Sequence, residues 1–199
     1  MSVTGDGLDA ELRRLVADGA IDLATDRALR AYGPELVGWL CAISANEADA
    51  YDAFSWMSEE LWKSLRRYQG GCSMRAWCYM LARQGAARMR ARPQHRHEEP
   101  VSSVSSILHT AAQVWSTTRR EEVRNEHIYS EIRQTLDNDD QALLVLRVDR
   151  DLSWRDIAIV LLGDETSDDE LVRKAAALRK QFERVKIHLR GLVSQRLAE

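Results

Sequence analysis

The chain has 199 residues, of which 45% are hydrophobic and 30% are charged, and its formal net charge is −3. These values are ordinary for one globular domain or two small ones, and no apolar run approaches the roughly 20 residues that a membrane-spanning helix needs. The opening residues, MSVTGDGLDAELRRLV, carry acids early and lack the apolar core of a signal peptide, so we expect a cytoplasmic protein.

The composition favours helices over strands. The chain has three prolines and ten glycines and no long alternation of β-branched residues, so we expect an all-α fold. Two small helical domains joined by a linker would account for its organisation. Three cysteines, Cys41, Cys72 and Cys78, fit no zinc spacing and are odd in number, which predicts buried or half-buried thiols, no metal and no cofactor.

A first helical block is expected over residues 8–92, and its core follows two apolar stripes at steps of three and four residues. The stripes are Leu29, Tyr32, Leu36, Trp39, Leu40 and Ile43, then Ala50, Phe54, Met57, Leu61, Leu65 and Tyr68. Gly70 and Gly71 are expected to end the second of these helices, and Ser73 is a suitable N-cap for the next one.

An acid-free segment follows the second stripe. Between Leu61 and His97 the chain has no Asp or Glu but many cations, namely Lys63, Arg66, Arg67, Arg75, Arg83, Arg88, Arg90, Arg92 and Arg96. Helical spacing aligns Arg75, Tyr79, Arg83, Ala86 and Arg90 on one face. Cations interleaved with an aromatic ring suit single-stranded DNA, because arginines pair with phosphates and bases stack on rings. Trp77, on the opposite face, is expected to be a core residue.

The linker is expected over residues 93–116, where prolines and serines replace the amphipathic pattern. Val101, Ile107, Leu108, Val114 and Trp115 predict that the linker lies against another surface. His95 and His97 have the residue type of metal ligands, but we interpret them as part of a solvated linker.

A second helical block, over residues 117–197, contains a helix-turn-helix pattern. Ser153 and Asp156 resemble a capping box before a short amphipathic helix, which Gly163 ends. Ser167 or Thr166 then caps a long helix whose apolar stripe is Leu171, Ala175, Leu178, Phe182, Val185 and Leu189. The opposite side carries Arg173, Ala176, Ala177, Lys180 and Arg184, and Lys174 and Gln181 flank it. This face suits a DNA groove, although the alternative is a solvated basic face on a bundle helix.

These two blocks resemble the extracytoplasmic-function sigma factors, the smallest promoter-specificity subunits of bacterial RNA polymerase. The resemblance rests on DAYDAFSWMSEELWKSLRRY and CSMRAWCYMLARQGAARMRAR, followed by the helix-turn-helix. The matching residues, in order and spacing, are Asp49, Ala50, Asp52, Leu61, Trp62, Ser73, Arg75, Trp77, Leu81, Ala82 and Arg83. The chain departs from the family at Ser55-Trp56, at Gln84, and in a longer start to the last helix.

The resemblance implies a protein without enzymatic activity that has three contact surfaces. Residues 1–92 would dock on polymerase and hold the −10 element. Residues 117–199 would read the −35 element. The −10 candidates are Lys63, Arg66, Arg67, Tyr68, Gln69, Arg75, Tyr79, Arg83 and Arg90, with Gly70 and Gly71 in a loop that accepts a flipped base. The −35 candidates are Arg173, Lys174, Ala177, Lys180, Gln181 and Arg184. The polymerase candidates are Asp49, Asp52, Ser55, Trp56 and Glu59.

The expected partners are promoter DNA and core RNA polymerase, through the clamp helices of its largest subunit and, for the second domain, its flap. The resemblance also allows an anti-sigma protein, and it implies that the linker threads toward the polymerase active site. We expect no membrane partner and, since the chain ends soon after the second domain, no C-terminal sensor domain. Trp56 lies away from the apolar stripe and is expected to be an exposed anchor, unless it packs beneath the N-terminal helix or the linker.

Two other function classes account for less of the sequence. A stand-alone helix-turn-helix regulator would explain residues 151–190, but it leaves the acid-free segment and Trp56 without a role. An enzyme acting on nucleic acid would need a phosphate-binding loop, paired carboxylates at metal spacing or a catalytic triad, and the sequence contains none of these patterns.

Overall fold

The computed structural model describes residues 3–92 and 136–196, and throughout these ranges the regular structure is helical, with no strand. The all-α prediction is therefore confirmed for the described residues. Contacts divide the chain into two compact units, Met1–Thr118 and Arg119–Glu199, and each is described by itself. The predicted linker 93–116, including His95, His97 and Trp115, lies outside the described residues.

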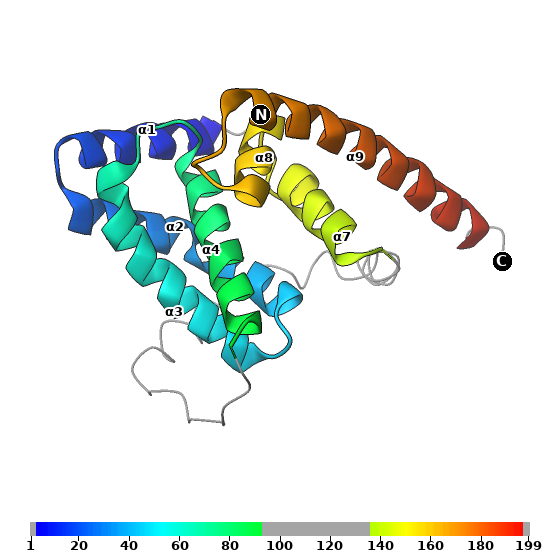
Figure 1. The fold of residues 1–199 in the computed structure, drawn as a ribbon, viewed down its shortest axis with the longest axis horizontal. Helices are drawn as coiled ribbons and strands as arrows, with labels where there is room; N and C mark the ends of the chain where they lie inside the picture. The colour runs from blue at the N-terminus through cyan, green and yellow to red at the C-terminus, as the bar shows by residue number, and fades with distance from the viewer. Residues whose placement is uncertain (1–2, 93–135, 197–199) are drawn as a thin grey trace. The chain divides into compact units, whose positions relative to one another are not determined.

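Unit 1 is a bundle of four helices and a short 3-10 turn. Its elements are α1 (Val3–Ala17), α2 (Ile21–Ile43), α3 (Glu47–Ser64), the 3-10 turn Leu65–Arg67 and α4 (Met74–Arg90). α3 packs on both α2 and α4, and α4 also contacts α2 and α1 (Figure 1). Because three helices surround it, α4 occupies the centre of the unit.

The first half of α4 forms the core of unit 1. Every residue from Ala76 to Ala82 is buried, on all sides of the helix. The Trp77 indole N–H donates to Ser64 Oγ at 3.3 Å, and its ring meets the edge of Tyr68. Trp77 is therefore a core residue, as predicted.

The junction between α3 and α4 differs in part from the prediction. α3 ends at Ser64, earlier than the glycine pair, because the chain tightens into a 3-10 turn in which the Tyr68 N–H binds the Leu65 carbonyl at 3.1 Å. Gly70 then adopts a φ of +75°, which a glycine tolerates without strain. Ser73 caps α4 as predicted, since its Oγ accepts the Ala76 N–H at 3.2 Å.

Unit 2 consists of three helices and a π-helical turn in the residues that the structure describes. Its elements are α7 (Asn138–Leu144), the π-helical turn Val145–Asp149, α8 (Trp154–Leu162) and α9 (Asp168–Arg196). α9 packs against α8 and α7 (Figure 1). The predicted stripe of α9 faces this core, with Leu171, Ala175, Leu178 and Val185 buried and Phe182 and Leu189 partly buried.

The predicted cap and end of α8 are confirmed, and the start of α9 shows one half of a capping box. Ser153 Oγ accepts the Asp156 N–H at 3.0 Å at the start of α8, and Gly163, with a φ of +102°, ends it. The Glu170 carboxylate reaches back to the Ser167 N–H at 3.3 Å, which marks Ser167 as the residue that precedes α9. Local sequence alone thus determines where these two helices begin.

Two expectations drawn from composition concern membrane spans and thiols. None of the helices in residues 3–92 and 136–196 combines the length and the apolar character that a bilayer crossing requires. Cys72 and Cys78 are buried, whereas Cys41 is exposed, contrary to the expectation for all three thiols. Cys41 is exposed because α2 turns this position away from its buried stripe.

Candidate nucleic-acid interface

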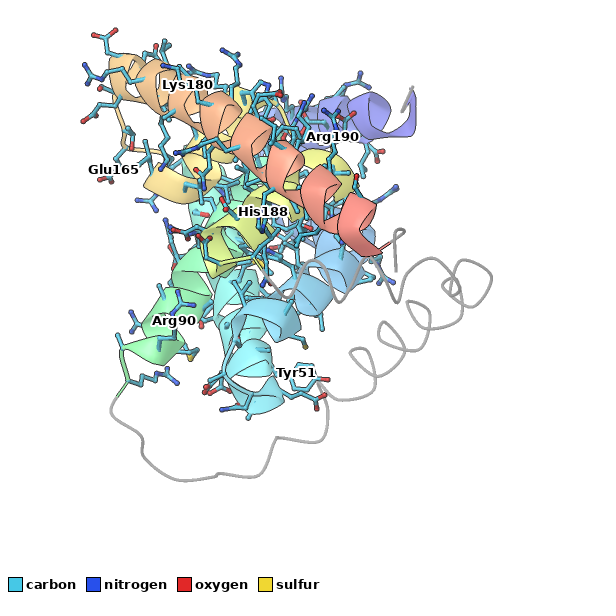
Figure 2. The ribbon with its side chains drawn as sticks, turned by 90° about the vertical axis from the view of Figure 1, so that its right-hand side faces the viewer. Tyr51, Arg90, Glu165, Lys180, His188 and Arg190 are labelled. Carbon is cyan, nitrogen blue, oxygen red and sulfur yellow. The ribbon has the colours of Figure 1, made fainter. Side chains whose placement is uncertain are left out.

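α9 presents a cationic face opposite its buried stripe. The exposed residues on this face are Arg173, Ala176, Ala177, Lys180 and Arg184. Alanines between the long cations leave room for a close approach of the helix backbone to a groove, while arginine and lysine side chains reach further to phosphates or base edges. Figure 2 shows Lys180 and Arg190 projecting from α9.

The cations of this face form no ion pair within the described part of the chain. Arg173, Lys180 and Arg184 make neither a salt bridge nor a hydrogen bond through their side chains with other residues in 3–92 or 136–196. By contrast, Lys186, at the edge of the face, pairs with Glu183 at 2.7 Å and lies over the Phe182 ring. The central cations are therefore not held in ion pairs among these residues, although the hydrogen bonds of Ser167 and, to a smaller extent, the charge of Arg173 lower the pKa of Glu170, one turn earlier in α9.

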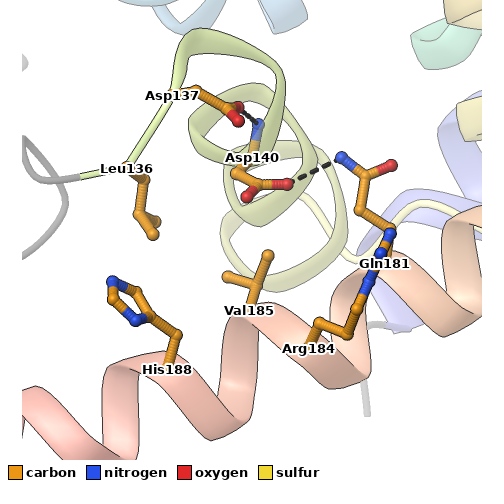
Figure 3. A pocket seen from close by; sticks show the side chains of 7 residues that line it. All are labelled: Leu136, Asp137, Asp140, Gln181, Arg184, Val185 and His188. Atoms are coloured by element: carbon orange, nitrogen blue, oxygen red, sulfur yellow. Dashed lines mark hydrogen bonds between the residues drawn. The ribbon is translucent and has the colours of Figure 1, made fainter.

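One predicted −35 residue has an internal role instead. Gln181 Nε2 donates to Asp140 Oδ1 at 2.6 Å and ties α9 to α7 (Figure 3). Gln181 is therefore corrected from a DNA-facing residue to a contact between helices, because its wheel position lies near the edge of the buried stripe. Lys174 is half-buried on the same edge.

A shallow hollow lies beside this contact, between the start of α7 and α9. It measures ≈ 360 Å³ and is lined by Leu136, Asp137, Asp140, Gln181, Arg184, Val185 and His188 (Figure 3). Asp137 is the N-cap of α7, since Asp137 Oδ1 accepts the Asp140 N–H at 2.8 Å. The two acids come from the start of α7, and the cation Arg184 comes from α9. The hollow therefore has no excess of positive charge that would favour an anion.

α8 and the chain before it hold α9 through charged and aromatic contacts. Arg155 pairs with Asp168 at 2.7 Å, which links the two helices across the turn. The Trp154 ring meets the edge of Phe182 at 5.5 Å between centroids. The Arg147 guanidinium lies 5.0 Å from the Trp154 centroid and donates to the Leu152 carbonyl. These contacts fix the direction of the cationic face.

The acid-free segment of unit 1 is not acid-free in space. Several of its cations pair with carboxylates from α2 and α3, namely Lys63 with Glu59, Arg67 with Glu60, Arg75 with Glu35 and Arg92 with Asp52. The expectation of an uncompensated positive surface is therefore wrong for these positions. Folding brings acids to the cations from outside the segment.

Arg75 shows this most clearly. Its guanidinium binds both oxygens of Glu35, and the two side chains are 31% and 14% exposed. Burial alone would lower the pKa of Arg75, but the hydrogen bonds and charge of Glu35 raise it above its ordinary value. Arg75 is thus a structural ion pair in the α2–α4 interface, and its assignment to the −10 surface is corrected.

Both tyrosines predicted to meet the −10 strand are buried. Tyr79 has no exposed surface and meets the edge of Trp39 at 5.1 Å between centroids. The Tyr68 hydroxyl donates to the Cys72 carbonyl at 2.6 Å. Burial raises the pKa of the Tyr68 phenol, and the nearby Asp9 carboxylate adds to this shift. Neither ring can stack on a base, because Tyr79 packs against Trp39 of α2 and Tyr68 packs against Trp77 of α4, and both are buried.

The remaining −10 candidates near the glycine loop stay at the surface. Arg66 and Gln69 are exposed beside the loop, together with the paired Lys63 and Arg67. Gly71 is exposed as well, whereas Gly70 is half-buried. The loop thus keeps an open, polar outer side.

The exposed cations of α4 lie in its second half. Arg90 is exposed near the end of the helix, where it donates to the Ile43 carbonyl at 3.5 Å (Figure 2). Arg88 is also exposed, and the buried Met89 between them packs into the core. Arg83, five residues before Arg88, is half-buried. A cationic surface on α4 therefore begins only beyond the part that the other helices enclose.

Arg88 and Trp56 are in contact, and neither residue was among those predicted to bind DNA. The Arg88 guanidinium lies 5.8 Å from the centroid of the Trp56 ring. Trp56 is half-buried, and it packs so closely on α4 that a Cβ added to Gly85 would lie 3.1 Å from its ring. Trp56 is therefore less exposed than expected of an interface anchor, because α4 covers one side of the ring.

The other polymerase candidates occupy the outer side of α3. Ser55 is exposed, and Asp52 and Glu59 are exposed but paired with Arg92 and Lys63. Asp49 is half-buried and accepts a hydrogen bond from the Asn46 side chain at 2.9 Å, at the N-cap of α3.

Trp62 is an exposed aromatic residue on this side of α3. It is 46% exposed, and its indole N–H donates to Asp22 Oδ1 of α2 at 2.7 Å. Leu23, next to Asp22, is 47% exposed. Trp62 belongs to the sequence motif, but a helical wheel of α3 gives it no special position. Its hydrogen bond joins α3 to α2, and such a contact between helices cannot be read from spacing within one helix.

Comparison with known proteins adds nothing to these observations. No protein-family model, no curated protein and no solved structure matches the chain. Among the described residues, no group of three or more His, Cys, Asp and Glu side chains is arranged to hold a metal ion. Within residues 3–92 and 136–196, the cationic face of α9 and the exposed parts of α3 and α4 are the features from which we infer a function.

Proposed function

We propose that this chain is a promoter-specificity subunit of bacterial RNA polymerase, of the kind represented by extracytoplasmic-function sigma factors. The observation that carries the proposal is the cationic face of α9, whose central cations form no ion pair among the described residues. This face stands on a short capped helix and a glycine turn, the arrangement that places a recognition helix in a major groove.

In this proposal α9 reads the −35 element. Arg173 and Lys180 are seven residues apart, so they are separated by about 10 Å along the helix axis and can contact successive parts of one groove. Ala176 and Ala177, between them, let the helix backbone approach the bases. Arg184, two turns beyond Ala177, would contact the phosphate backbone.

Unit 1 would hold the melted −10 strand with the residues that stay exposed. Arg66 and Gln69 flank the glycine loop, and Arg88 lies beside the half-exposed Trp56 ring. With Tyr68 and Tyr79 buried, the ring beside Arg88 can still offer part of a face to a base. The −10 surface is thus proposed at the loop and at the second half of α4.

Polymerase docking would use the outer side of α3. Ser55, Glu59 and Trp62 follow one another at helical spacing and are all exposed. Aromatic residues are enriched at the centres of protein interfaces, because a ring buries a large area with little loss of side-chain entropy. Trp62 is therefore the proposed anchor of this contact, in place of the more buried Trp56.

The test is transcription in vitro with core polymerase, the full chain and a genomic library of templates. We expect RNA chains that start at defined sites only when the chain is added. The double variant with Arg173→Ala and Lys180→Ala should lose starts that depend on a −35 element. Arg190→Ala is the matched control, because Arg190 is an exposed cation of α9 outside the central face, and it should keep most of the activity.

A stand-alone regulator is a second candidate, and one observation favours it. The neutralised cations and buried tyrosines of unit 1 leave α9 as the more open DNA-binding surface. Mobility shifts with duplex promoter DNA separate the two functions. A regulator binds without core polymerase, whereas the proposed subunit needs core polymerase because its overall charge is negative and its free affinity for DNA is low.

A further inference from the structure

The loop between the 3-10 turn and α4, residues 69–73, is fastened by two side chains of α1. Asp9 Oδ1 accepts the N–H of Met74, the first residue of α4. The Asp9 carboxylate also pairs with Arg13, with Oδ2 and Nη2 2.7 Å apart. Arg13 Nη2 in turn donates to the Cys72 carbonyl at 3.3 Å. The C-terminal end of the loop is thus bound at two nearby backbone groups by α1.

These bonds satisfy groups that the loop cannot satisfy by itself. The first N–H groups of a helix have no partner within the helix. The Ser73 hydroxyl accepts the N–H of Ala76, and the Asp9 carboxylate accepts the N–H of Met74. A carboxylate at this position is also favoured by the helix dipole. The start of α4, and with it the end of the loop, is therefore fixed by a residue 65 positions earlier in the chain.

The Cys72 carbonyl, which accepts from Arg13, also has a second hydrogen-bond donor. The Tyr68 hydroxyl reaches the Cys72 carbonyl at 2.6 Å from the other end of the loop. Arg13 also lies beside Gly70, since a Cβ added there would be 4.0 Å from Arg13 Cδ and Nε. Tyr68 and Arg13 hold the inner side of the loop, while Gln69 and Gly71 remain exposed on its outer side.

We propose that Asp9 and Arg13 are positioning residues that fix the shape of loop 69–73 and thereby determine which base it accepts. This inference rests on the proposed function, in which the loop receives an unpaired base of the −10 element. A loop with two adjacent glycines has wide conformational freedom, so a defined pocket needs supports from outside it. In this proposal both residues act on the base indirectly, through the Cys72 carbonyl and the Met74 N–H.

The same helix offers a matched control. Glu11 of α1 pairs with Arg27 of α2 at 3.2 Å, on a side of the helix that does not contact the loop. Arg27→Ala therefore removes an anchor of α1 and leaves the loop contacts in place. Arg13→Ala removes the loop contacts, and Arg13→Lys keeps a cation that can pair with Asp9 and donate to Cys72.

The experiment measures base preference with holoenzyme built from the full chain. Templates carry all four bases at each −10 position, and initiation is compared in competition. Arg13→Ala should lower the discrimination at one −10 position about tenfold, because a small displacement of a positioned group has a large effect. Preferences at other positions, and the affinity for core polymerase, should stay within about twofold. Arg13→Lys should restore part of the lost discrimination, and Arg27→Ala should keep it all.

The outcomes separate this inference from the proposed function. If wild-type holoenzyme starts no RNA at defined sites, both proposals are overturned. If the wild type initiates and Arg13→Ala keeps its full base preference, or loses activity equally at all positions, the positioning role alone is overturned. Asp9→Asn repeats the test with a nearly isosteric side chain if Arg13→Ala does not fold, and the same single-position loss is expected.

Discussion

α4 and α9 both carry arginines at helical spacing, yet the fold treats them in opposite ways. α9 contacts its unit along one side, so the stripe from Leu171 to Val185 is buried and the opposite cations are exposed. α4 contacts α1, α2 and α3, so both sides of its first half are buried. A cationic stripe in a sequence therefore becomes a cationic surface only where the helix has a side that its neighbours leave uncovered.

The charges follow the same difference. Arg75 on α4 meets Glu35 of α2, whereas Arg173 on α9 forms no ion pair in the described residues. Removing one partner of an ion pair inside an interface destabilises the fold, and the pairing holds the cation away from any DNA contact. An exposed cation outside any ion pair contributes little to stability, but it remains available to phosphates.

The largest expected difference between the two helices is in thiol reactivity. In a Cys41→Ser background, Cys78 of α4 should react with iodoacetamide at least about a thousandfold more slowly than a cysteine introduced in α9 by Ala177→Cys, because Cys78 requires unfolding. Burial also raises the pKa of the Cys78 thiol, so less thiolate is present near neutral pH. Mass spectrometry of labelled peptides gives both rates, and equal rates would contradict the enclosed position of α4.

Truncation of one side chain in each helix gives the next largest difference. Tyr79→Ala should lower the free energy of unfolding of unit 1 by about 3–5 kcal/mol, because it leaves a cavity beside Trp39. Lys180→Ala should change stability by less than about 0.5 kcal/mol, because its side chain is exposed. Urea unfolding monitored by circular dichroism, with hydrogen exchange of α4 peptides, measures both. A small effect of Tyr79→Ala would show that its ring is not in the core.

Removal of one arginine from each helix should give opposite phenotypes. Arg75→Ala should cost about 1–3 kcal/mol of stability, since it removes the guanidinium that binds both oxygens of the largely buried Glu35 carboxylate. Arg173→Ala should leave stability unchanged and weaken binding of holoenzyme to a −35 element by about 1–3 kcal/mol if it contacts a base. Thermal unfolding and promoter binding are measured on both variants. If Arg173→Ala lost stability and Arg75→Ala lost only DNA binding, our assignment would be reversed.

Glycine substitutions provide the smallest and most local contrast. A Cβ at Gly85 of α4 would lie 2.8 Å from the Ala53 carbonyl oxygen, so Gly85→Ala should destabilise unit 1 by about 1–3 kcal/mol. At Gly191 of α9 no atom lies within 4 Å of the added Cβ. Gly191→Ala should therefore stabilise α9 slightly, by up to about 1 kcal/mol, through its better helix propensity. Denaturation midpoints test both signs, and stabilisation by Gly85→Ala would show that α3 and α4 are not in close contact.

Local sequence determined much of this molecule. Apolar periodicity predicted the buried stripes of α3 and α9, and serines at the expected positions predicted the starts of α4 and α8. These features depend on residues within one or two turns of each other, so they can be derived from spacing and capping chemistry alone. For the same reason, the cationic side of α9 was predictable from its sequence.

Tertiary structure alone decided which cations and rings stay free. The sequence could not show that Glu35 meets Arg75, 40 residues away, or that Asp9 reaches the start of α4. Tyr79 resembles a surface residue on a helical wheel, but it is fully buried and packs against Trp39 of α2. A wheel describes one helix in isolation, whereas burial and ion pairing depend on how many sides of that helix its neighbours cover.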